Sequence, residues 1–126
     1  MTTTGIAAPT PTAAPAVAVD QLLDDAWTVD CAIRLRQPAW AAASADHLLI
    51  NLARYGQQIQ TRWAHLDPDV AQSLAQDVLT VQLASLTIAD ELRWGLTWPA
   101  ADLYDRVGRL IHREAIAVGD TAWSLD

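Results

Sequence analysis

The sequence predicts an all-α protein: a single-domain four-helix bundle with up-down-up-down topology, in which two long central helices are flanked by two shorter ones. Apolar residues recur at spacings of three and four from Asp20 onward, and the chain has no sustained alternating run bounded by hairpin turns. Its 126 residues are enough for one compact domain that folds without a disulfide or a structural metal. Short connections between the helical segments favour antiparallel neighbours.

The first helix is predicted over residues 20–35, where a broad apolar stripe continues until Gln37-Pro38 ends it. The second helix should begin at Pro38, because proline suits the first helical position, and should continue to about Leu66. At 1.5 Å per residue the second and third helices would each be about 40 Å long. This long pair is therefore predicted to protrude beyond the shorter helices, either as an arm or as a dimerisation surface.

The third helix begins with a strong start signal, because Asp67 can cap it, Pro68 can take its first position, and Gly95 can end it. Its stripe alternates spacings of four and three through Leu74, Val78, Val81, Ser85, Ile88 and Leu92, and a second set widens the apolar face, namely Leu79, Leu83 and Leu86. The fourth helix is predicted to open at Thr97 and Pro99 and to end before Gly119.

Charges support the same division of the chain. Acidic residues gather toward the start of each predicted helix and arginines toward its end, which is the arrangement that the helix dipole favours. In an antiparallel bundle the basic end of one helix lies beside the acidic start of the next. Most charged residues therefore have a structural use that needs no ligand.

Residues 1–18 are rich in Ala, Thr and Pro and carry no charge, so they are predicted to form a disordered tail before a bundle domain over residues 19–126. A secretory leader and a membrane span are not expected, because no suitable apolar segment is present. The single Cys31 cannot form an internal disulfide, and we expect a cytoplasmic protein.

The net charge of −7 predicts that the chain does not bind nucleic acid directly, because phosphates would be repelled. No strand-turn-helix nucleophile, Gly-rich phosphate loop or paired Glu motif is present, so catalytic residues, cofactors and metal sites are not predicted. Of the three histidines, two are expected at helix ends or on the surface and one is expected to be partly buried, and none is expected to bind a metal ion. We therefore favour a protein that is not an enzyme.

Six tryptophans in a chain without phenylalanine suggest that some remain exposed. The best candidate patch lies where the third helix breaks, and it consists of Arg93, Trp94, Leu96 and Trp98. Tryptophan and arginine are frequent anchors of protein interfaces. The sequence thus predicts a small acidic interaction or regulatory module that binds another protein, with a basic partner favoured, and that could form a homodimer.

The alternative is a helical bundle with an aromatic-lined pocket for a small molecule, which could be ligand-binding or catalytic. Its polar and aromatic groups would come from the second helix, where Asp46, His47, Tyr55 and Trp63 are the candidates.

Overall fold

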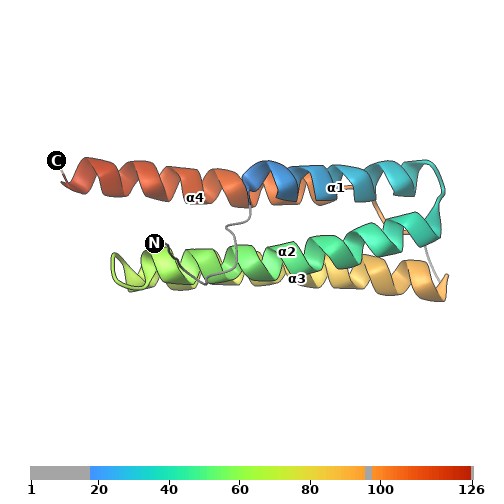
Figure 1. Ribbon diagram of the computed structural model, residues 1–126, viewed down its shortest axis with the longest axis horizontal. Helices are drawn as coiled ribbons and strands as arrows, with labels where there is room; N and C mark the ends of the chain where they lie inside the picture. Colours follow the sequence, from blue (N-terminus) through green and yellow to red (C-terminus); the bar gives the residue numbers. More distant parts are fainter. Residues whose placement is uncertain (1–17, 96–97, 126) are drawn as a thin grey trace, which may run out of the picture.

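The structure is a computed structural model that describes residues 18–95 and 98–125, with side chains described up to residue 119. The described chain forms four helices, which are α1 (Val19–Arg34), α2 (Pro38–Trp63), α3 (Pro68–Trp94) and α4 (Leu103–Leu125). Consecutive helices run in opposite directions, and α2 and α3 form one layer beneath a second layer of α1 and α4 (Figure 1). The predicted all-α up-down-up-down bundle is confirmed. The predicted tail over residues 1–18 lies, apart from Ala18, outside the described residues.

Each helix packs against the helices before and after it, and α4 returns to α1, so the four helices close a ring. With 16 residues α1 is much shorter than α2, which has 26. As a result α4 continues well past the start of α1, and α2 and α4 face each other there without an intervening fourth helix (Figure 1). Large side chains fill the centre of this part, because Tyr55 and Trp63 are the largest fully buried residues.

Helix α3 begins and ends as its sequence predicts. The Asp67 carboxylate accepts hydrogen bonds from the backbone N–H groups of Asp69 and Val70, at 3.1 and 3.3 Å. At the other end Gly95 takes the left-handed conformation, with φ of 65°, and its N–H donates to the carbonyl of Glu91. Glycine adopts this conformation without the steric cost that a Cβ atom would add.

The predicted end of the second helix is wrong by a few residues. Helix α2 ends at Trp63, and its carbonyl accepts the N–H groups of Leu66 and Asp67 at 3.1 and 2.9 Å. These bonds form a tight turn that leads directly into the cap of α3. Residues 64–66 therefore belong to the connection.

Both predicted ends of the fourth helix need correction. Helix α4 begins at Leu103 rather than near Pro99, and it continues through Gly119 to Leu125. Its start is set by a residue of another helix. Thr97, which was predicted to open the helix, lies outside the described residues. One glycine inside a helix costs only about 1 kcal/mol relative to alanine, which is too little to end it.

The helices contribute their apolar stripes to one shared core, in which most members are aliphatic. The predicted stripe of α3 lies in this core, but Leu79, Leu83 and Leu86 do not, because they are 53%, 55% and 40% exposed. Within the described residues, no helix combines the length and the hydropathy that crossing a membrane requires.

Candidate functional site

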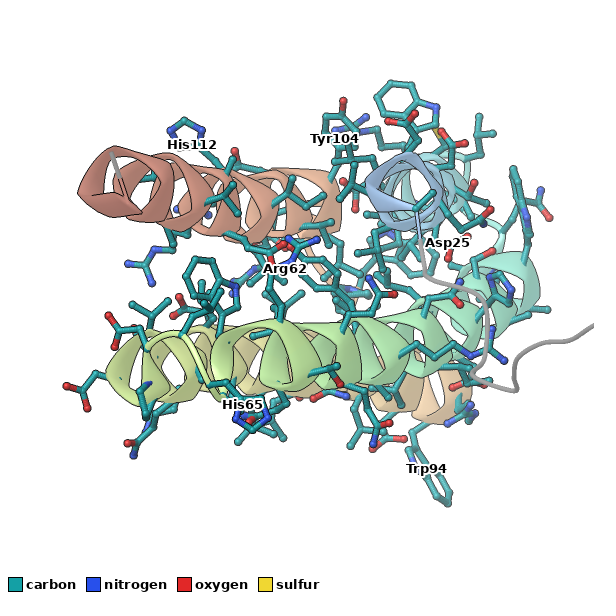
Figure 2. All side chains as sticks on the ribbon, turned by 60° about the vertical axis from the view of Figure 1, so that its left-hand side comes forward. Asp25, Arg62, His65, Trp94, Tyr104 and His112 are labelled. Atoms are coloured by element: carbon teal, nitrogen blue, oxygen red, sulfur yellow. The ribbon has the colours of Figure 1, made fainter. Side chains whose placement is uncertain are left out.

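The predicted interaction patch lies at one end of the bundle. Trp94 is the last residue of α3, is 76% exposed, and projects away from the other helices (Figure 2). Because the left-handed cap at Gly95 follows immediately, the Trp94 ring is held on the final turn of a regular helix. A large apolar ring in this position is fully available to a partner.

A second tryptophan completes this end of the bundle from the chain that follows α3. Trp98 is 38% exposed, and the Arg36 guanidinium lies 4.5 Å from the centre of its ring. Arg36 belongs to the α1–α2 connection, which reaches the same end of the bundle as the end of α3 (Figure 1). The same connection and the first turn of α2 expose Leu35 and Trp40. We call Leu35, Arg36, Trp40, Trp94 and Trp98 the tryptophan end.

Arg93 joins the two sets of predicted site residues. Its guanidinium donates to Asp46 on α2 and, at 3.3 Å, to Asp90 one turn back along α3. The hydrogen bond and the charge of Asp46 raise the pKa of Arg93. Arg93 thus anchors the end of α3 to α2, while Leu96, the remaining member of the predicted patch, lies outside the described residues.

Two members of the predicted pocket converge on Glu114 of α4. The Tyr55 hydroxyl donates to this buried carboxylate at 2.8 Å, and the Trp63 indole N–H donates to it at 3.2 Å. Arg62 reaches the same carboxylate from a more exposed position, at 3.1 Å (Figure 2). Burial, and then the hydrogen bond to Glu114, raise the pKa of Tyr55. The arrangement bridges α2 to α4 where α1 does not reach.

His47 belongs to a different cluster, centred on Asp25 of α1. Its Nδ1 lies 3.1 Å from the Asp25 carboxylate, which also accepts from Asn51 at 2.6 Å and from Gln21 at 3.0 Å. Asp25 and Asn51 are buried, and Asp25 faces α2 (Figure 2). The structure therefore brings Tyr55 and Trp63 together but places Asp46 and His47 with other partners, and the small-molecule pocket stays a prediction.

A third buried carboxylate, Asp30 on α1, caps α4. Its two oxygens accept the backbone N–H groups of Leu103 and Tyr104, both at 3.0 Å. This bonding pattern is that of a helix N-cap, supplied here by a residue 73 positions away. Burial raises the pKa of Asp30, and the two backbone hydrogen bonds oppose that shift. The cap explains why α4 begins at Leu103.

The sequence predicts helix-start charges at Asp25 and Asp30 and assigns no role to Glu114, so the burial of these three acids was not predicted. A signal was present, because Asp25 follows Leu22 by three residues and Glu114 follows Leu110 by four, which puts both acids on apolar stripes. In the described part of the chain, no cluster of three or more His, Cys, Asp or Glu residues is placed to hold a metal ion. His65 and His112 lie on opposite sides of the molecule (Figure 2).

A groove follows the seam between α2 and α3 on the side away from α1 and α4. It consists of two adjoining hollows, of about 530 and 350 Å³, which share Gln60, Ala75 and Leu79. All residues that line them are Ala, Gly, Pro, Val, Leu, Thr or Gln, so no charged side chain contributes. Here α2 and α3 approach each other closely, since even a Cβ atom placed on Gly56 would lie only 3.3 Å from the Val78 side chain. We call these two hollows the outer groove.

Comparisons with known proteins assign no family to this chain. No protein-family model matches it, and neither the curated proteins nor the solved structures gave a significant match.

Proposed function

We propose that this protein is a small helical interaction module that binds another protein through the tryptophan end. The observation that carries the proposal is the position of Trp94, a 76% exposed indole fixed on the last turn of α3. Covering one large apolar side chain contributes about 1.5 to 3 kcal/mol to association, and interfaces concentrate their binding energy in such anchors. Among the described residues, Trp94 has no hydrogen bond, ion pair or ring contact that would account for its position.

The neighbouring residues support the same site. Trp98 is already ordered by Arg36, so little side-chain entropy is lost when a partner covers it. Arg93 and Asp46 form an ion pair between α3 and α2 next to Trp94. The net charge of −7 favours a partner with a basic surface, since opposite charges steer association and raise its rate.

The test is quantitative capture from the native lysate with the full chain immobilised. Four forms are compared: the wild type, Trp94→Ala, Trp98→Ala and the control Trp27→Ala. Trp27 on α1 is 52% exposed and packs against Tyr104 on α4, and it is not one of the residues of the tryptophan end. Circular dichroism establishes that all four forms are equally helical.

We expect that the wild type and Trp27→Ala retain the same protein from the lysate. Trp94→Ala should lower the amount of this protein that is captured at least about 30-fold, which is the effect of losing a hot-spot residue. Trp98→Ala should have a smaller effect in the same direction. Equal capture by all four forms would place the binding site elsewhere and refute the assignment.

A further inference from the structure

The outer groove has a ridge beside it on the same helix. Leu79, Leu83 and Leu86 follow one another at spacings of four and three along α3, and each is between 40% and 55% exposed. Toward the start of α3 the same side of the helix is lined by small residues, Ala71 and Ala75, which form the floor of the groove. One helix therefore contributes both a row of large exposed side chains and part of the lining of the groove.

We propose that a second copy of this chain covers the outer groove, forming an antiparallel two-fold dimer of α2–α3 layers. A two-fold interface brings one patch against itself, so the patch must contain both a projection and the hollow that receives it. If the two-fold axis passes beside Leu79, each α3 residue before position 79 meets the residue of the second copy that is equally far after position 79. Leu83 then lies on Ala75 of the second copy, and Leu86 lies beside its Gln72.

The charge distribution favours a second copy over a different, charged partner. Two chains of net charge −7 repel each other, so self-association requires a contact surface without acidic groups. Between residues 71 and 89 the only charged residue is Asp77, whose carboxylate is bound to Arg113 on α4 at 2.6 Å. The outer groove offers no charge that would select a basic or an acidic ligand.

The size of the surface is sufficient for a stable dimer. Helices of 26 and 27 residues are about 40 Å long, and two packed helices are about 20 Å wide. The part without exposed acids, opposite residues 71–89, takes about 28 Å of this length and would bury about 560 Å² on each copy, and the total of about 1,100 Å² lies at the small end of specific interfaces. The contact would be mostly Leu, Ala and Gln.

The proposal uses a surface separate from the tryptophan end, so the two can fail independently. Sedimentation velocity on the full chain should give a dimer for the wild type. Leu83→Glu on the ridge and Ala75→Glu in the groove should each raise the dissociation constant at least about 30-fold. The control Ile116→Glu, at a 50% exposed position on α4, should leave the dimer intact, and Trp94→Ala should do so as well.

The register is tested by crosslinking in a Cys31→Ala background. Chains carrying Leu83→Cys are mixed with chains carrying Ala75→Cys, and oxidation should join one of each. Ser73→Cys, an exposed position on the opposite side of α3, should not crosslink with Leu83→Cys. A monomeric wild type, or a dimer that survives both glutamate substitutions, would overturn the dimer proposal. The effect of Trp94→Ala on partner capture bears only on the proposed function of the tryptophan end.

Discussion

Glu114 should be the most important polar residue for stability in the described part of the bundle. It lies on α4 and accepts hydrogen bonds from Tyr55 and Trp63, which are only 2% and 1% exposed. Replacing Glu114 with alanine leaves both buried donors without their acceptor. Each buried donor that loses its partner costs about 1 to 3 kcal/mol.

The two donors together set a range of about 2 to 6 kcal/mol for Glu114→Ala. The loss should fall in the lower half of this range, because Arg62 beside the cluster is half exposed and water can enter the volume that the Glu114 side chain leaves. We therefore expect a loss of about 3 kcal/mol in the free energy of unfolding. Tyr55→Phe removes a donor together with its need for an acceptor, so it should cost about 1.5 kcal/mol.

Urea unfolding followed by circular dichroism measures these losses. Asp105→Ala is the matched control, because Asp105 is an acid on the same helix whose ion pair with Arg109 is exposed, and it should cost at most about 0.5 kcal/mol. A double-mutant cycle between Glu114→Ala and Tyr55→Phe should show a coupling of about 1 kcal/mol. Additive effects, or a Glu114→Ala loss no larger than that of the control, would contradict the bonding described here.

Two further predictions follow from pKa shifts. Burial raises the pKa of Asp30 above its ordinary 3.8, so the folded protein binds this proton more tightly than the unfolded chain. As the pH falls from 7 through the raised pKa toward 3.8, urea unfolding should show the wild type gaining stability relative to Asp30→Asn; a constant difference would contradict this. Burial and Glu114 also raise the pKa of Tyr55 above its ordinary 10.0. The variant Tyr104→Phe leaves Tyr55 as the one tyrosine of the chain. Its tyrosinate absorbance should appear only well above pH 10 and together with unfolding, because Tyr55 loses its proton more readily in the unfolded chain. A rise in tyrosinate absorbance while the protein is still folded would contradict this prediction.

The helices could be predicted from the sequence wherever their ends are determined locally. Pro38, Asp67 with Pro68, and Gly95 each act within a few residues of themselves, and α2 and α3 begin or end there. The start of α4 could not be predicted in this way. Its cap comes from Asp30, and no pattern near Pro99 reports a partner that lies 73 residues earlier in the chain.

The buried acids show the same limit in the candidate site. Asp25 and Glu114 sit on the apolar stripes of α1 and α4, but apart from Gln21 on α1 their hydrogen-bond partners come from α2, between 22 and 59 residues away. Helix-dipole arguments explain an acid near a helix start equally well whether it is exposed or buried. Only the register between helices decides between the two, and that register depends on packing of the whole core.

The exposed leucines of α3 differ from the buried acids, because they stay 40% to 55% exposed within the described part of the bundle. A helix that packs on one side only normally carries charged residues on its other side. Over most of its length α3 carries leucines and glutamines there instead, and it ends in an exposed Trp94. The three buried carboxylates all have hydrogen-bond partners, whereas α3 keeps three leucines and a tryptophan at least 40% exposed. That combination is expected of a chain whose α3 meets further surfaces, one at the outer groove and one at the tryptophan end.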